Sequence, residues 1–592
     1  MKNIFRYKSL WCIGLVLSLF IQSCDLDYQN TGTINPDNVW KDKNMISAFL
    51  TDIYGFPGWP ANGASSDEGI DANGGNLSDY LRGIIDVEKT GQGFDYGKID
   101  KINFFLQQLE TVPESVLSST EKSQLAGQAL FWRAWDYWGK VATFGGVPLI
   151  TKFQDVTNRE SLFVPRNKTS ECMAQILKDL DDAISFLPDK WDGVNYGRID
   201  KGIAMAFKGK VQMWYASPLF NPSGDKARWE AAYTTNKAAV DFLKSVGKGL
   251  FPDYKQIWKK EQNEEVIMVN PFYYSDHTYN TNLFRPEPIS KDAANCNQPI
   301  LPLLLAYPKK DGSALVLDIE RLSDPVYNAD FLTDFYTNRD DRFYATIFCG
   351  GQIYPTPDFT GGQRYWCTWI WEEDKYTSMG FKQMNRGANY GISGFFSLKA
   401  IDESLAMSNV GDGDVDWVEI RFAEVLMNYG ECANEVGKAE EALQVLYDIR
   451  KRAGIEPGSG RYGVTAASQG DIREAYINER FVEFAFEGKR WGDLRRWKRF
   501  DILNNLQHRA GLYTVLNPEE DVTTFDWTND ISNPEVRKKF HAVYRENLDG
   551  EPSYKYNLSL NHWFYPIKKN DLDRNSKLEQ NNEWGGAFDP LQ

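Results

Sequence analysis

A single cysteine, Cys24, stands where an apolar leader ends and an acidic stretch begins. The apolar run 10–21 is twelve residues long, whereas a helix that crosses a bilayer needs about 20 residues. Lys2, Arg6 and Lys8 precede the run without an acidic residue among them, as in a secretory signal. A thiol in this place can be alkylated by lipid, so the chemistry that its position suggests is covalent attachment to a membrane.

The residues directly before Cys24 favour a lipoprotein cleavage site over an ordinary signal peptidase site. Ile21, Gln22 and Ser23 resemble a bacterial lipobox, whereas an ordinary signal peptidase site has small residues in an A-x-A-like arrangement. We therefore expect cleavage before Cys24, which would carry lipid on its sulfur and on its new amino group. Several acyl chains, at about 0.8 kcal/mol per buried methylene, hold a protein on a membrane without spanning it. The alternative is an ordinary buried cysteine near a conventional cleavage site.

The second chemical signal is a set of aromatic side chains on loops. The chain has 19 tryptophans, and Trp59 lies in a Gly/Pro-rich stretch while three others lie in GGQRYWCTWIWEEDKY. Sugar rings stack their C–H faces on aromatic planes, and Asp, Asn and Arg bind the hydroxyl groups. The predicted glycan-binding residues are Trp59, Asp67, Asn76, Tyr80, Arg364, Trp366, Trp369 and Trp371. The alternative is packing, because the spacing of Trp369 and Trp371 equally suits a strand with one buried face.

Composition and missing motifs narrow the function classes. The full chain carries 66 basic and 82 acidic residues; removal of the leader leaves 63 basic residues and a net charge near −19, which argues against a nucleic-acid partner. No H-E-x-x-H, P-loop or G-x-S-x-G sequence occurs. Residues 412–416 begin like a calcium loop, but Trp417 and Ala423 replace the glycine and glutamate that such a loop needs. We therefore predict no metal site, whereas a glycosidase needs only two carboxylates and is not excluded.

Hydrophobic periodicity predicts a largely helical chain that positions these loops. Helical spacing occurs over 37–54, 98–109, 121–144, 170–186, 201–216 and 229–243, and Gly145-Gly146 ends the third of these stretches. Between them, 55–97 is an inserted loop region. From 251 to 416 the chain has short apolar runs and many aromatics, and 265–269 and 343–348 are predicted as strands or irregular structure; the tail beyond Gly511 is similar.

A repeat signal follows in VEIRFAEVLMNYGECANEVGKAEEALQVLYDIRKRAG. Gly430 and Ala442 lie twelve positions apart with larger apolar residues between them, which is the spacing of one tetratricopeptide unit. The alternative is any amphipathic helical hairpin. The predicted fold class is mainly α, with tetratricopeptide-like helix pairs as a scaffold and an irregular, loop-rich α/β elaboration.

Several long blocks then resemble the SusD/RagB family of outer-membrane lipoproteins. They include FWRAWDYWGKVATFGGVPLI, GRIDKGIAMAFKGKVQMWYASP, TNRDDRF, INERFVEFAFEGKRWGDLRRWKRF and HWFYPIKKNDLDRNSKLEQN, in the order of the family and nearly end to end. The resemblance implies the SusD-like fold and a regional division: signal peptide 1–23, tether 24–36, N-terminal region 37–250, aromatic-rich ligand region 251–416, family-motif helices 417–511 and a C-terminal region 512–592. Residues 479–496 match the family pattern ER...E...EG.RW.DLRR, and we interpret their charges as internal ion pairs.

The resemblance also implies a role and partners. Such proteins capture oligosaccharides at the outer membrane and form a lid over a SusC-like, TonB-dependent transporter; Asp25 and Asp27 suit export to the cell surface. We therefore expect a non-enzymatic glycan-binding lipoprotein whose partners are that transporter, the ligand and membrane lipid. The alternatives are peptide capture, as in the RagB branch, a surface glycosidase, and a lid without a ligand. No cofactor is expected, although calcium binding by some relatives leaves a structural calcium ion open.

Overall fold

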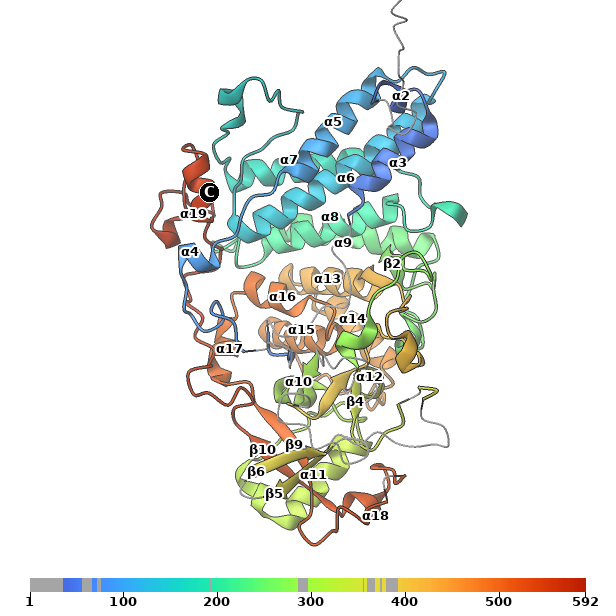
Figure 1. Cartoon of the computed structure of the whole chain (residues 1–592), viewed down its shortest axis with the longest axis vertical. Helices are drawn as coiled ribbons and strands as arrows, with labels where there is room; N and C mark the ends of the chain where they lie inside the picture. The colour runs from blue at the N-terminus through green and yellow to red at the C-terminus, as the bar shows by residue number, and fades with distance from the viewer. Residues whose placement is uncertain are drawn as a thin grey trace, which may run out of the picture.

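The computed structural model describes residues 36–55, 66–71, 76–191, 193–285, 297–354, 356–358, 368–372, 375–379, 392–526 and 528–592, with only the backbone at 36–37, 90, 282–283, 368–372 and 375–379. Figure 1 shows helices α5 to α9 in the upper part of the molecule, α13 to α16 in the middle, and a small sheet with α11 and α18 at the opposite end. Across the described ranges no helix has the length and apolar character needed to cross a membrane.

The N-terminal region is built from paired helices, as the periodicity predicts. After α2 (Pro36–Val39) and α3 (Lys43–Ile53) come α4 (Val87–Thr90), α5 (Gly97–Thr111), α6 (Ser119–Phe144), α7 (Thr169–Phe186), α8 (Lys201–Ala216) and α9 (Lys226–Ser245). The long helix α6 begins at a capping box between Ser118 and Glu121 and ends at Gly145, whose φ of 77° favours glycine. One boundary differs from the prediction: the stretch 37–54 is two helices, because the Asp42 side chain caps the backbone N–H groups of Asn44 and Met45.

The tetratricopeptide prediction is confirmed in α13 (Phe422–Glu435) and α14 (Ala439–Arg452), which pack as a pair, and α13 also lies against α9. A Cβ atom on Gly430 would lie 2.9 Å from the Cβ of Val445 in α14 and 1.9 Å from the hydroxyl oxygen of Tyr476 in α15 (Gln469–Glu483). That hydroxyl donates to the Ala442 carbonyl oxygen at 2.7 Å. Gly430 therefore lets three helices approach one another, which is the role of a small residue in such a unit.

The remaining helices and strands are short. The helices are α10 (Leu301–Ala306), α11 (Pro325–Thr337), α12 (Asp341–Thr346), α16 (Arg490–Arg496), α17 (Phe500–Leu506), α18 (Pro534–Arg537) and α19 (Lys569–Arg574). The strands are β1 (Gly69–Ile70), β2 (Val266–Asn270), β3 (Gln298–Pro299), β4 (Ile347–Cys349), β5 (Thr368–Glu372), β6 (Lys375–Met379), β7 (Phe395–Ser397), β8 (Trp417–Arg421), β9 (Gly511–Leu516) and β10 (Phe540–Arg545).

The described strands form small sheets. Their order is β10-β9-β5-β6 in one sheet of four strands, and β1-β3, β2-β8 and β4-β7 in pairs. The pairs are antiparallel, whereas β5 runs parallel to β9 at Trp369 and Val515. The strand predicted at 265–269 is present, but most of 343–348 is helix α12, because the Asp340 side chain accepts from the N–H groups of Arg342 and Phe343.

Two apolar cores meet at α15. The larger core joins α3, α5 to α9 and α13 to α17, and it includes Tyr476. The smaller core joins α10, α11, α12, β4, β9 and β10, and it includes Phe481 and Val482. Cys349 is a buried free thiol at the end of β4. Because α15 contributes to both cores, it joins the helical scaffold to the smaller α/β part.

The charged family motif on α15 and α16 lies in the interior. Eight of its charged residues are buried: Glu479, Arg480, Glu483, Glu487, Arg490, Asp493, Arg495 and Arg496. The prediction of internal ion pairs is confirmed, but most partners come from distant segments rather than from the same helix. The Arg342 and Arg421 guanidinium groups reach Glu483 at 2.8 and 2.6 Å, and Arg496 reaches Glu431 at 2.5 Å.

These ion pairs keep the buried carboxylates charged. Burial by itself raises the pKa of Glu483, but Arg452, Arg421 and Arg342 outweigh that effect and hold the pKa far below its usual value. Burial also opposes ionisation of Asp493, and the charges of Arg480 and Arg496 lower its pKa nevertheless. Because every charge has partners, the motif stabilises the junction of the two cores, whereas an unpaired charge there would destabilise it.

Candidate glycan-binding surface

Asp67, one of the predicted ligand residues, is buried in the interior. Its carboxylate accepts two hydrogen bonds from Arg490 of the family motif, from Nε at 2.8 Å and from Nη2 at 2.7 Å. The side chain of Asp67 is 2% exposed. Sequence reasoning placed Asp67 on an exposed loop because its neighbours are polar, but its carboxylate is already used. Asp67 therefore anchors residues 66–71 to the scaffold and is not available to a ligand.

The neighbouring Glu68 completes this anchor. Its Oε1 accepts from the Phe486 N–H at 2.9 Å, and its backbone carbonyl oxygen accepts from the Ile300 N–H at 3.1 Å. The hydroxyl of Ser66 donates to Oε2 at 2.9 Å. Burial raises the pKa of Glu68 to about 7, although these hydrogen bonds act in the opposite direction. Glu68 is thus a buried carboxyl whose charge changes near neutral pH.

Three segments that border the predicted ligand loops meet at this anchor. Strand β1 pairs with β3, with Gly69 opposite Pro299 and Ile70 opposite Gln298. The Ser393 N–H donates to the side-chain oxygen of Gln298 at 3.0 Å. Residues 66–71, 297–299 and 392–397 are therefore neighbours in space although they are far apart in the sequence.

Tyr80 is also buried and serves packing. Its ring stacks on Tyr565 with centroids 4.5 Å apart and meets Trp491 edge-on. Its hydroxyl donates to the carbonyl oxygen of His562 at 2.9 Å. Burial raises the pKa of Tyr80 well above its usual value. Tyr80 therefore fixes the chain that follows Asn76 and offers no free face to a sugar.

Asn76, in contrast, is exposed and next to an aromatic ring. Its Nδ2 donates to the Tyr554 hydroxyl at 3.2 Å. The Arg82 guanidinium lies over the Tyr554 ring, 4.5 Å from its centroid, and Asp79 holds it through an ion pair of 3.2 Å. An amide, a phenol and a guanidinium thus gather at one surface. Sequence reasoning missed Tyr554 because 478 positions separate it from Asn76, and it missed Arg82, six positions after Asn76, because only the Tyr554 ring brings the guanidinium to this surface.

The structure describes only some of the other predicted residues. Trp59, Arg364, Trp366 and the lipidation candidate Cys24 lie outside the described residues. Trp369 and Trp371 lie in β5, where Trp369 is opposite Ser378 and Trp371 opposite Tyr376. Their strand belongs to the four-stranded sheet, and Trp369 also pairs with Val515 of β9.

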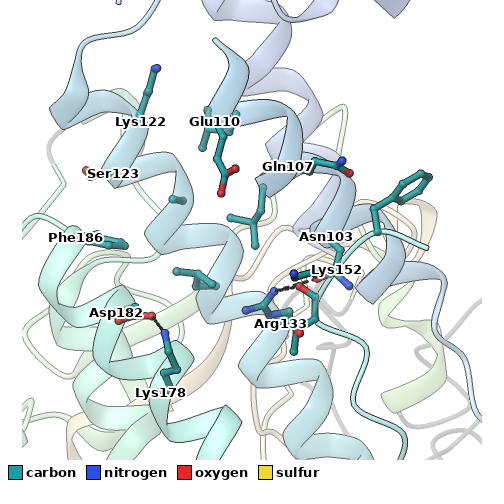
Figure 2. Close-up of a pocket in the computed structure, with 16 residues that line it drawn as sticks. Asn103, Gln107, Glu110, Lys122, Ser123, Arg133, Lys152, Lys178, Asp182 and Phe186 are labelled. Carbon is teal, nitrogen blue, oxygen red and sulfur yellow. Dashed lines mark hydrogen bonds and ion pairs between the residues drawn. The ribbon is translucent and has the colours of Figure 1, made fainter. Parts of the chain in front are cut away.

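The structure also exposes aromatic rings that sequence reasoning did not select. Tyr273 and Tyr274 are 53% and 68% exposed in a turn that is closed by hydrogen bonds between Tyr273 and His277. Phe153 and Phe186 are exposed as well, and both line a cavity of about 720 Å³ between α5, α6 and α7. Figure 2 shows this cavity, which none of the predicted residues lines. The sequence could have indicated Tyr273 and Tyr274, because they are aromatic residues beside polar neighbours in a loop, as in YYSD.

No metal centre is evident in the part of the chain that the structure describes, since no group of three His, Cys, Asp or Glu side chains there is arranged to hold an ion. The carboxylates of the family motif are buried and paired with arginines.

The described surface around Asn76 has the chemistry of a binding surface, with hydrogen-bond donors and acceptors beside an aromatic ring.

This chain is similar in sequence to one protein and in fold to two solved structures. "SusD-like protein P2" of Formosa agariphila is 23% identical over 504 residues, which is 83% of this chain and 80% of that protein. A SusD-like protein of Bacteroides fragilis has a similar structure with a TM-score of 0.69 and 22% identity, covering 92% of this chain and 98% of the other. A second Bacteroides fragilis structure, described as a SusD-like carbohydrate binding protein, has a TM-score of 0.65 and 20% identity over 91% of this chain and 99% of the other.

Two family models match as well. The model described as "Starch-binding associating with outer membrane" matches residues 92–213. The model described as "SusD family" matches residues 256–584, a span that covers more than half of the chain and contains the buried arginine–carboxylate motif. The chain therefore belongs to the SusD family.

Proposed function

We propose that this protein is a surface-exposed, lipid-anchored subunit that captures an oligosaccharide and delivers it to a SusC-like TonB-dependent transporter, which it covers as a lid. The observation that carries the proposal is family membership, since the SusD family model matches residues 256–584. The description of the second family model names starch and the outer membrane, and a structural neighbour is described as a carbohydrate binding protein. A ligand moves such a lid only by binding one of its positions more tightly than the other.

The proposed ligand surface excludes two of the residues that the sequence suggested. Asp67 and Tyr80 are engaged in the interior, so the set becomes Trp59, Asn76, Arg364, Trp366, Trp369 and Trp371, joined by Tyr554 and Arg82. The exposed Asn76 amide beside the Tyr554 ring supports this choice, because sugars bind through stacking and paired hydrogen bonds.

Binding without catalysis is the second part of the proposal. A glycosidase would need two carboxyl groups about 5–9.5 Å apart across a cleft. The acidic side chains of the family motif do not meet this need, because they are buried and paired with arginines. We assign no cofactor, and a structural calcium ion is left to a calcium titration followed by thermal unfolding.

The anchor is the third part. Lipid on Cys24 would hold the chain on the outer membrane, and Asp25 and Asp27 would direct it to the outer face. The anchored protein would then have two partners: a membrane barrel that lies beneath the lid, and the lipid bilayer around that barrel.

Calorimetry with plant, host and microbial oligosaccharides and with a peptide mixture tests the proposal. We expect binding to at least one glycan, a loss of at least tenfold in affinity in Trp369→Ala and Asn76→Ala, and no change in Tyr274→Ala, which removes an exposed ring elsewhere. Tight peptide binding without glycan binding would favour the RagB-type alternative. New reducing ends after incubation with a polysaccharide would indicate a glycosidase, and uptake that survives both substitutions would indicate a lid without a ligand.

A further inference from the structure

The cavity between α5, α6 and α7 is distinct from the proposed ligand surface. Its volume of about 720 Å³ lies within the range of about 300–1,000 Å³ that is usual for small-molecule sites. In Figure 1, α5, α6 and α7 lie at the end of the molecule opposite the sheet that contains β5. The segment 151–153 closes one side of the cavity. A ligand here would therefore occupy a second, independent site.

The floor of the cavity is apolar and its edge carries two aromatic rings. Leu109 and Leu130 are buried at the floor, whereas Phe153 and Phe186 are 41% and 39% exposed. Gly127 of α6 lets the chain at Phe186 approach closely, because a Cβ atom on Gly127 would lie only 3.1 Å from the Phe186 Cβ. Exposed rings beside a cavity give flat apolar faces to a ligand.

The polar groups divide into those that are used and those that are free. Arg133 is satisfied: its Nε and Nη2 donate to Asp179 at 2.7 Å each, and its Nη1 donates to Asn103 at 3.0 Å. Among the described residues, the exposed side chains of Gln107 and Glu110 have no hydrogen-bond or ion-pair partner, and neither do the Lys122 and Lys152 ammonium groups that also line the cavity. In the view of Figure 2 the Glu110 side chain lies between Phe186 on one side and Gln107 on the other. A free acceptor and a free amide thus stand over the apolar floor.

This chemistry fits a sugar better than a peptide. Most of the wall is helix, whose main-chain N–H and C=O groups are used within the helices, so an extended peptide would find a backbone edge only at the short segment 151–153. A sugar hydroxyl both donates and accepts, so it can bind the Glu110 carboxylate and the Gln107 amide. A ring's C–H face can then lie on Phe153 or Phe186.

We propose that this cavity is a second binding site for a short oligosaccharide. The choice of a glycan as the ligand class rests on the proposed function, whereas the location and the contacts rest on the cavity itself. Because β5, which contains Trp369, lies at the end of the molecule opposite α5, α6 and α7, a short ligand would occupy the cavity independently of Trp369, and a long polysaccharide could engage both and gain avidity.

The test uses the full-length chain and four neutral probes: maltotetraose, cellotetraose, mannotetraose and xylotetraose. Ala126→Leu fills the cavity from α6 with a good helix former, and Glu110→Gln removes the free carboxylate. Glu114→Gln is the matched control, because it makes the same change at an exposed position outside the cavity. Each substitution is also combined with Trp369→Ala, which weakens the proposed ligand surface.

We expect calorimetry to show residual binding of one probe in Trp369→Ala and a further loss of at least tenfold when Ala126→Leu or Glu110→Gln is added. Hydrogen exchange should slow in 103–110, 122–133 and 178–186 when that probe is present. Residual binding that neither cavity substitution changes would overturn this inference and leave the proposed function intact. The inference of a second site would also be overturned if the unaltered chain binds a probe but Trp369→Ala shows no residual binding. It would be overturned again if the unaltered chain binds none of the four probes. The proposed function fails separately, if the wider glycan panel gives no binding.

Discussion

Asp67 and Arg490 form a bidentate ion pair in the interior although 423 positions separate them in the sequence. Arg490 also lies over the Phe481 ring, 3.9 Å from its centroid, and donates to the Ile477 carbonyl oxygen. The pair joins the segment 66–71 to the family motif at the place where β1 meets β3. The charged motif therefore does more than join two cores: it also anchors a segment that borders the predicted ligand loops.

Replacing Asp67 by Ala should destabilise the protein strongly, because it leaves the Arg490 charge buried without a partner. Loss of one member of a buried pair costs about 3–5 kcal/mol, which we expect to appear as a fall of several degrees in the thermal unfolding midpoint. Asp79→Ala is the control, since it breaks the half-exposed pair with Arg82, for which about 0–1 kcal/mol is expected. Equal midpoints for the two variants would contradict the anchoring role of Asp67.

Replacing Glu68 by Gln should change how stability depends on pH. Burial raises the pKa of Glu68 in the folded protein from 4.5 to about 7. The stability gained from the bound proton is therefore fully present below about pH 4.5 and is lost as pH rises through about 7. A glutamine has no acidic proton and can still accept from the Phe486 N–H, so the stability of Glu68→Gln relative to the unaltered chain should grow between about pH 4.5 and about pH 7 and then level off.

Denaturant unfolding of Glu68→Gln at several pH values in that window provides the measurement. Glu88→Gln, an exposed substitution in α4, is the control and should follow the unaltered chain. A stability difference between Glu68→Gln and the unaltered chain that does not grow with pH would show that the Glu68 carboxyl does not titrate in this window.

Gly430→Ala should destabilise the tetratricopeptide pair. The new Cβ would lie 1.9 Å from the Tyr476 hydroxyl oxygen and 2.9 Å from the Val445 Cβ, so the helices must move apart and the hydrogen bond from Tyr476 to Ala442 is disturbed. Overpacking of this kind costs about 1–3 kcal/mol. Gly139→Ala in α6 is the matched control, since its Cβ would meet nothing within 4 Å, and it should stabilise the helix by about 0.5–1 kcal/mol. Thermal unfolding compares them, and a Gly430→Ala midpoint at or above that of the unaltered chain would count against close packing.

Cys24→Ala should release the protein from the membrane, because no thiol then remains at the lipobox to carry lipid. Incorporation of labelled palmitate and separation of membrane from soluble material measure the change. Cys172→Ala is a control for the loss of a cysteine in the folded body, where its thiol is buried. A Cys24→Ala protein that stays membrane-bound and reaches the cell surface would overturn the anchor assignment.

Local patterns explain which elements could be predicted. The helices α5 to α9, α13 and α14 repeat apolar residues at helical spacing, and Gly145 and Ser118 mark ends that depend only on nearby residues. The helix α12 was missed because a short apolar run does not distinguish a strand from a helix. Its type depends on the cap at Asp340, whose side chain forms hydrogen bonds within the helix and an ion pair to Arg342.

The candidate site shows where local pattern ceases to suffice. Asp67, Asn76 and Tyr80 lie in one polar stretch and look alike as ligand residues, yet the first and last are buried and only Asn76 is exposed. Their surroundings come from Arg490, Tyr554 and Tyr565, each more than 400 positions away. Burial of a polar residue depends on whether a distant partner compensates the loss of water, and no local pattern contains that partner.

By itself the sequence determined the helical scaffold, the tetratricopeptide pair with its close contact at Gly430, the internal character of the charged motif and the family, because periodicity, small residues and long motif blocks are local properties of the chain. The tertiary structure alone decided which charges pair with which, that Asp67 anchors rather than binds, and that α5, α6 and α7 enclose a cavity. These depend on contacts between distant segments, whose energies arise only when the chain has folded and water has been excluded.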